Sequence, residues 1–169
     1  MNPSEYDDAY DDKQRIRGAV VTDPIATLKP KPVATVRPNT TVIDAVHLMV
    51  QKKIGCVCVT EKDKLLGIFT ERDVLRKIVE PGADSKKTLV QDVMTKNPET
   101  LTARDRIAFA LNKMHVGGYR HIPIVEGDKL VGIISQRDIA DLIVELFPEG
   151  VLNVPPEPRL GIPTRPEGG

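Results

Sequence analysis

The chain contains the same unit twice. When the sequence is shifted against itself by 65 residues, residues 35–80 align with residues 100–145 without a gap. In that alignment "GIFTERD" (residues 67–73) meets "GIISQRD" (residues 132–138), and "DKL" precedes both by one residue. A match that keeps one register over this length indicates an internal duplication, so the chain must fold as two similar units.

Each copy begins with a short extended segment, residues 32–36 or 98–102, followed by a helix. Residues 41–53 and 106–115 carry apolar side chains at helical spacing. Thr41 and Asp105 lie near the starts of these helices, as capping side chains do.

Each copy then continues with a hairpin and a closing helix. The predicted strands are the β-branched and apolar runs 56–60, 65–69, 121–125 and 130–134. The predicted helices are residues 71–80 and 136–147. The fold class is therefore α+β, with two β-α-β-β-α units packed around a pseudo-twofold axis.

The boundaries follow from composition. Residues 17–80 form the first unit, residues 88–147 form the second, and "PGADSKK" (81–87) links them. Residues 1–16 are acidic and poorly patterned, and residues 148–169 hold six prolines and four glycines. Both ends are interpreted as flexible tails.

Charge and hydropathy limit the partners. Lys plus Arg equals Asp plus Glu at 24 each, whereas nucleic-acid binders usually carry a basic excess, so a nucleic-acid partner is not expected. No apolar run has the length of a membrane span, and the acidic start lacks the apolar region of a signal peptide, so no membrane partner is expected. Cys56 and Cys58 are interpreted as reduced core thiols of a cytoplasmic protein. A metal site is not expected, because the three histidines show no ligand spacing with these cysteines.

The repeated heptad supports two interpretations. In one, Thr70 and Ser135 cap the helices that follow, and Asp73 and Asp138 complement their dipoles. In the other interpretation, the N-termini of the same helices bind an anion, and the carboxylate accepts hydrogen bonds from ribose hydroxyls. The glycine lets a flat ligand approach the backbone. Capping alone does not explain the repeated arginine or the repeated glycine.

The two heptads, together with "LVQDVMTKNPETL" and "GYRHIPIV", resemble a tandem of CBS domains, or Bateman module, over about residues 17–147. The resemblance implies regulatory binding of adenosine-containing ligands, namely AMP, ADP, ATP, NAD or S-adenosylmethionine, in clefts between the two motifs. It implies no required cofactor, only an adenosine nucleotide as regulatory ligand.

Carried over residue by residue, the resemblance implies two unequal sites. Asp138 and Ser135 would hold the ribose, and Arg120, His121 and Arg137 would face phosphates. The walls of this stronger site would be Val33, Ala34, Thr35, Ile54 and Ile133. The weaker site would contain Thr70, Arg72, Asp73, Pro98, Glu99 and Thr100, because Gly55 and Cys56 replace the basic pair in the first copy.

The resulting functional prediction is an adenosine-ligand sensor that forms a homodimer and signals to an unidentified effector protein in trans. The alternative is a dimeric interaction scaffold with degenerate nucleotide sites. An enzyme is not expected, because Asp73 and Asp138 lie in separate copies and no nucleophile has a base at supporting spacing.

Overall fold

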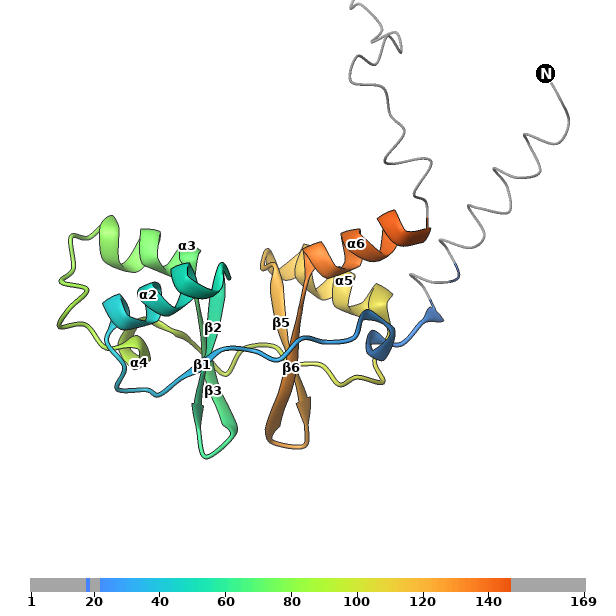
Figure 1. Cartoon of the computed structure of the whole chain (residues 1–169), viewed down its shortest axis with the longest axis horizontal. Helices are drawn as coiled ribbons and strands as arrows, with labels where there is room; N and C mark the ends of the chain where they lie inside the picture. The colour runs from blue at the N-terminus through green and yellow to red at the C-terminus, as the bar shows by residue number, and fades with distance from the viewer. Residues whose placement is uncertain (1–17, 19–21, 147–169) are drawn as a thin grey trace, which may run out of the picture.

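The computed structural model describes residue 18 and residues 22–146. Two similar α+β units lie side by side, each with a hairpin whose turn points away from the helices (Figure 1). The predicted tails, residues 1–16 and 148–169, lie outside the described residues.

The first unit follows the predicted order of elements. It contains β1 (Thr35–Val36), α2 (Val42–Lys52), β2 (Cys56–Glu61), β3 (Lys64–Thr70) and α3 (Glu71–Val74). The closing helix differs from the prediction of one regular helix over 71–80, because η2 (Leu75–Val79) continues it as a π-helical turn. This wider turn buries Ile78 and leaves Leu75 and Val79 exposed.

The second unit contains α5 (Ile107–Gly117), β5 (His121–Glu126), β6 (Lys129–Ser135) and α6 (Gln136–Leu146). Its opening segment contains α4 (Val90–Val93) and β4 (Thr95–Lys96). The predicted strand 98–102 is reduced to a single bridge between Leu101 and Ile124.

Helix caps explain where the long helices begin and end. The Thr41 hydroxyl accepts a hydrogen bond from the Asp44 amide and caps α2, as predicted. Asp105 does not cap α5: its carboxylate accepts hydrogen bonds from the Thr102 amide and hydroxyl at 2.7 and 2.9 Å, and Arg106 is the N-cap residue. Gly118, with φ of 66°, ends α5 in the left-handed conformation that glycine adopts without strain.

The strands form one sheet in the order β1-β2-β3-β6-β5, with β4 beside β3. The two hairpins meet near their turns, where Lys64 pairs with Lys129. The register shifts at Val59/Thr60 and again at Ile124/Val125, which are equivalent positions in the duplication.

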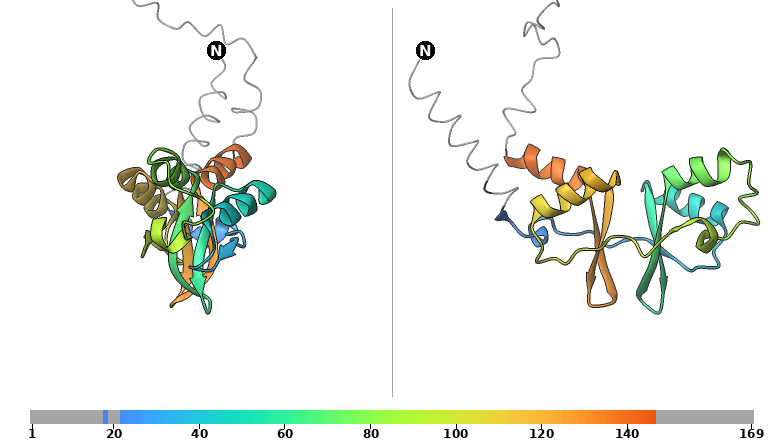
Figure 2. Two further views of the ribbon diagram at one scale, coloured as in Figure 1. Left: turned by 90° about the vertical axis from the view of Figure 1, so that its left-hand side faces the viewer. Right: turned by 180° about the vertical axis from the view of Figure 1, so that it is seen from behind.

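The opening segments cross between the units. η1 (Ile25–Leu28) lies in the opening segment of the first unit, yet the fully buried Ile25 packs in the core of the second, with Ile107 and Ile122. Conversely, Val90 of α4 packs in the first core, with Val42 and Phe69. Figure 2 shows the chain passing between the units in both directions. We call the opening segment of each copy its opener; the opener of the first copy contains η1 and that of the second contains α4. Each core is therefore completed by the opener of the other copy.

A smaller apolar cluster lies between the units and contains Cys56, Cys58 and Ile68. Both cysteines are free thiols, and burial raises the pKa of each to about 12, so they stay protonated at neutral pH. Both thiols therefore serve as small apolar side chains at this interface.

Candidate functional site

The first heptad spans the junction of β3 and α3. The Thr70 hydroxyl accepts a hydrogen bond from the Asp73 amide at 3.3 Å. The Asp73 carboxylate accepts in return from the Thr70 amide at 2.9 Å and its hydroxyl at 2.7 Å, all through Oδ2. This reciprocal arrangement is a capping box, which confirms the capping interpretation of the motif.

The second heptad repeats this geometry. Asp138 Oδ2 accepts from the Ser135 amide at 2.7 Å and its hydroxyl at 2.6 Å, and the Asp138 amide donates back to Ser135 Oγ at 3.3 Å. The difference between the two copies lies at the other carboxylate oxygen, Oδ1, which pairs with Lys77 in Asp73 and with Lys31 in Asp138.

The repeated glycines have a structural cause that differs from the predicted one. A Cβ on Gly67 would lie 2.9 Å from the Thr95 carbonyl oxygen and would clash with the Met94 side chain. A Cβ on Gly132 would lie 2.9 Å from Pro30 Cβ. Both glycines admit the crossing opener of the other copy, so the expectation that they admit a flat ligand was wrong.

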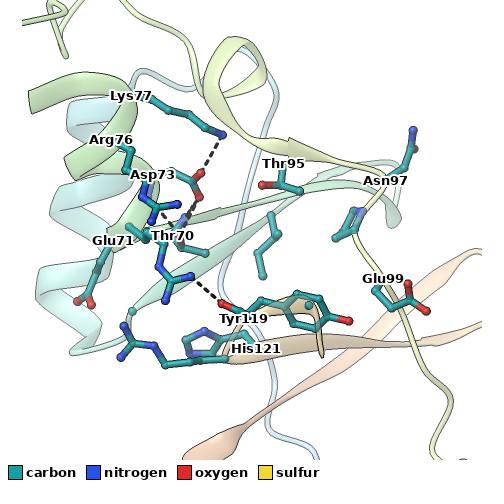
Figure 3. Close-up of a pocket in the computed structure, with 17 residues that line it drawn as sticks. Thr70, Glu71, Asp73, Arg76, Lys77, Thr95, Asn97, Glu99, Tyr119 and His121 are labelled. Carbon is teal, nitrogen blue, oxygen red and sulfur yellow. Dashed lines mark hydrogen bonds and ion pairs between the residues drawn. The ribbon is translucent and has the colours of Figure 1, made fainter. Parts of the chain in front are cut away.

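A pocket of about 570 Å³ lies in front of Asp73 (Figure 3). Four segments supply its walls: Gly55 before β2, the first heptad with the following helical turn, the opener of the second unit, and the loop before β5 with the first residue of that strand. Its lining residues are Gly55, Ile68, Thr70, Glu71, Arg72, Asp73, Arg76, Lys77, Thr95, Asn97, Pro98, Glu99, Gly117, Gly118, Tyr119, Arg120 and His121. The pocket is thus shared by both units.

Basic side chains are concentrated on one side of this pocket. Lys77 lies one turn after Asp73, forms an ion pair with Asp73 Oδ1 at 2.8 Å and donates to the Val93 carbonyl oxygen at 2.6 Å. Arg72 donates to the Gly118 carbonyl oxygen at 2.6 Å and so connects the two units. With Arg76 and Arg120, these groups outnumber the acidic side chains of the lining, which favours an anionic ligand.

Two lining residues have shifted pKa values. Burial and the neighbouring Arg120 charge lower the pKa of His121, against the opposing effects of Asp138 and Glu71. His121 is therefore mainly neutral at pH 7. Burial, with the nearby Glu99 carboxylate, raises the pKa of Tyr119, so its phenol stays protonated and can donate a hydrogen bond.

The sequence interpretation assigned Arg120 and His121 to Asp138, but both line the pocket that contains Asp73. The backbone explains the misassignment: the Gln136 amide donates to the Arg120 carbonyl oxygen at 3.0 Å, so the Arg120 main chain does lie at the start of α6. Its side chain is nevertheless among those that line the Asp73 pocket.

The residues predicted for the Asp73 site are largely brought together. Thr70, Arg72, Asp73, Pro98 and Glu99 all line the pocket, whereas Thr100 does not.

The residues predicted for the Asp138 site are more dispersed. Val33 and Ile133 pack against the central cluster, and Ala34 and Ile54 pack against the core of the first unit. Val33 and Thr35 also line a smaller pocket of about 210 Å³ near the hairpin turns, which does not include Asp138.

Two ion pairs lie at or next to Asp138. Arg137 Nε lies 3.9 Å from Asp141 Oδ2. Asp138 Oδ1 accepts a hydrogen bond from the Lys31 ammonium at 2.6 Å. Lys31 was absent from the predicted set.

Sequence reasoning also missed Arg76, Lys77 and Tyr119. A signal for the first two was present, because the 65-residue shift sets Arg76 and Lys77 against Asp141 and Leu142. This comparison predicts a more basic environment for Asp73 than for Asp138.

The CBS domain family matches residues 21–80 and 90–145. The mitochondrial CBS domain-containing protein CBSX3 of Arabidopsis thaliana is 38% identical over 109 residues, 62% of this chain. The chain spans about half of that relative, 53% of its length.

Solved structures show the same fold. A CBS-domain protein from Burkholderia ambifaria superposes with a TM-score of 0.67 at 34% identity, covering 72% of this chain and 93% of that one. A hexameric CBS-CP12 protein from bloom-forming cyanobacteria gives a TM-score of 0.64 at 30% identity, over 70% of this chain and 71% of its own.

Within residues 22–146, the helices are too short or too polar to cross a membrane. The family match covers both units, and each unit contains an opener that crosses to the other unit and one copy of the heptad. The chain belongs to the CBS-domain family and carries two CBS domains in tandem.

Proposed function

We propose that the chain is a regulatory module that binds an adenosine-containing ligand in the Asp73 pocket. The observation that carries this proposal is the composition of that pocket, in which a capping carboxylate, several guanidinium groups and an aromatic ring face one cavity. Its volume of about 570 Å³ is in the range of small-molecule sites.

Each part of the pocket suits one part of a nucleotide. Asp73 can accept hydrogen bonds from ribose hydroxyls, as acidic residues do in dinucleotide-binding folds. Arg72, Arg76 and Arg120 supply planar donors that match phosphate oxygens. Tyr119 and Ile68 offer apolar surface for a base. AMP, ADP and ATP fit this description best, and NAD and S-adenosylmethionine belong to the same class.

The position of the pocket supports a regulatory role. Its walls come from both units, so a ligand that contacts Asp73 and Arg120 together would favour one arrangement of the two units over others. An effector protein acting in trans would respond to that arrangement. The CBS-domain match and the likeness to a signal-transduction protein with CBS domains from Burkholderia ambifaria support this regulatory role.

A thermal-shift panel tests the proposal. AMP, ADP and ATP at about 100-fold above their Kd should raise Tm by about 5–10 °C. Asp73→Asn, which keeps the size of the side chain, should abolish that rise, and Arg120→Ala should reduce it most for ligands with more phosphates. Arg104→Ala is the control, because Arg104 does not line the pocket. The absence of a shift with any of these ligands would contradict the proposal.

The alternative of a dimeric interaction scaffold is supported by a different observation. Large apolar side chains are exposed on the helices: Val50 is 71% exposed, Val116 77%, Leu75 62% and Val79 63%. The helices of both units lie on the side opposite the hairpin turns (Figure 1). We propose that two copies associate through these helices, as a homodimer, whether or not nucleotide is bound.

A further inference from the structure

Asp138 is already paired with a lysine from the opener of the first unit. Lys31 Nζ donates to Asp138 Oδ1 at 2.6 Å, and the other oxygen, Oδ2, accepts from the Ser135 amide and hydroxyl. Both carboxylate oxygens are therefore engaged by groups of this chain, as both oxygens of Asp73 are by Thr70 and Lys77.

The backbone on either side of Lys31 is held in place. The Lys31 amide donates to the Ile133 carbonyl oxygen at 3.3 Å, and the Ile133 amide donates back at 3.1 Å. Pro30 packs over Gly132, where a Cβ would lie only 2.9 Å away. The main chain of Lys31 is therefore fixed beside β6, and its side chain reaches the first turn of α6.

The equivalent carboxylate in the first unit is paired in a different way. Asp73 Oδ1 is bound by Lys77 of the same helix, and Lys77 is also held by the Val93 carbonyl oxygen. The opener on that side contributes Thr95, Asn97 and Pro98 to the opposite wall of the pocket. The space between opener and helix stays open there.

A lysine joins opener and helix at both carboxylates, but at Asp138 the lysine belongs to the opener, whereas Lys77 belongs to the helix and reaches only the Val93 carbonyl oxygen of the opener. Asp138 is not among the residues that line the Asp73 pocket or the smaller pocket near the hairpin turns. Lys31 and Lys96 are equivalent in the duplication, so the difference depends on where these two side chains are directed.

Both partners of this ion pair keep their charge over a wide pH range. Burial raises the pKa of Asp138, but hydrogen bonds from Lys31 and Ser135 outweigh this effect and bring the pKa below its ordinary value. The hydrogen bond to Asp138 and its charge raise the pKa of Lys31. Asp141 and Leu142 stand where the first unit has Arg76 and Lys77, so the second site also lacks their positive charge.

We propose that Lys31 is an internal ligand of Asp138 that closes the second site, so that one nucleotide site is open within residues 22–146. The proposal rests on the function proposed for the Asp73 pocket. It predicts that removal of the Lys31 ammonium exposes a second carboxylate able to bind ribose. Adenosine is the suitable probe, because the second site has few basic groups to hold a phosphate.

Equilibrium dialysis with adenosine counts the sites. The wild-type chain should bind one equivalent and Lys31→Met two, and the added equivalent should disappear in the double variant Lys31→Met/Asp138→Asn. Lys31→Arg, which can keep the ion pair, should bind one. Lys96→Met is the matched control and should also bind one. Lys31 is 68% exposed, so these changes leave the cores intact, and thermal melts without ligand verify folding.

The outcomes separate this proposal from the proposed function. One equivalent for both wild type and Lys31→Met would overturn the closure by Lys31 and leave the Asp73 site standing. Two equivalents for wild type would also overturn it. No binding by wild type with one equivalent for Lys31→Met would support the closure and refute the Asp73 site. No binding by any variant would refute both.

Discussion

At the scale of single residues, the repeated heptad serves two purposes with the same side chains. Thr70 and Asp73 form a capping box that starts a helix, and the same carboxylate faces the pocket. The arginines differ, because Arg72 donates to the Gly118 carbonyl oxygen while Arg137 lies beside Asp141. Identical letters in the two copies therefore have the same local role and different long-range partners.

Gly67→Ala should destabilise the fold without any ligand present. The new Cβ would lie 2.9 Å from the Thr95 carbonyl oxygen, so the opener must shift. We expect a loss of about 1–3 kcal/mol in urea unfolding. Gly55→Ala is the control, since its nearest neighbour is the flexible Glu71 carboxylate at 3.3 Å. Equal stability of Gly67→Ala and wild type would show that the glycine is not required by the crossing opener.

The Asp138 cap should make stability depend on acid pH. The folded-state pKa lies below the ordinary value of 3.8, so the charged carboxylate stabilises the fold above about pH 4. This contribution is lost as the pH falls through the folded pKa. Wild type should exceed Asp138→Asn by about 0.5–2 kcal/mol at neutral pH. Unfolding followed from pH 7 to pH 3 should show that gap shrinking, and a constant gap would contradict the role of the charge.

At the scale of elements, the strands and helices of each copy were predictable because their apolar periodicity is local. The crossing of η1 and α4 was not, because an opener of four residues carries too few apolar positions to indicate which core it joins. Likewise, the sequence does not indicate that the Arg120 side chain lines the pocket that contains Asp73. The grouping of residues around a pocket shared by both units therefore could not be read from either copy alone.

The crossing predicts which unit loosens when an opener is truncated. Ile25→Ala removes a fully buried side chain from the core formed with Ile107 and Ile122, at a cost of about 2–5 kcal/mol. Hydrogen exchange should therefore accelerate first in α5 and β5, although Ile25 belongs to the opener of the first unit. Val90→Ala should accelerate exchange in α2 and β2 instead. Faster exchange confined to the unit that follows each opener would refute the crossed cores.

At the scale of the whole molecule, the two units are joined by the openers, the central cluster of Cys56, Cys58 and Ile68, and ion pairs between the hairpin turns. The ion pairs are exposed and stabilise the arrangement only weakly. The openers and the central cluster therefore dominate the coupling between the units. Compartment and effector stay predictions from the sequence.

The exposed apolar side chains predict self-association through the helices. Introducing charge at Val79 and Val116 together, as Val79→Glu and Val116→Glu, should shift sedimentation from a dimer toward a monomer, because a charge buried at an interface without a partner is costly. Glu61→Lys, in the hairpin turn region, is the control and should leave the dimer intact. A monomeric wild-type chain would contradict the dimer.

The assignment of the ligand site to Asp73 is tested most directly by calorimetric titration of AMP into two matched variants. Asp73→Asn and Asp138→Asn each remove one charge from equivalent capping boxes, so their effects on folding should be similar. The structure predicts that Asp138→Asn binds one equivalent of AMP as wild type does, and that Asp73→Asn does not bind. Binding retained in Asp73→Asn and lost in Asp138→Asn would contradict the account.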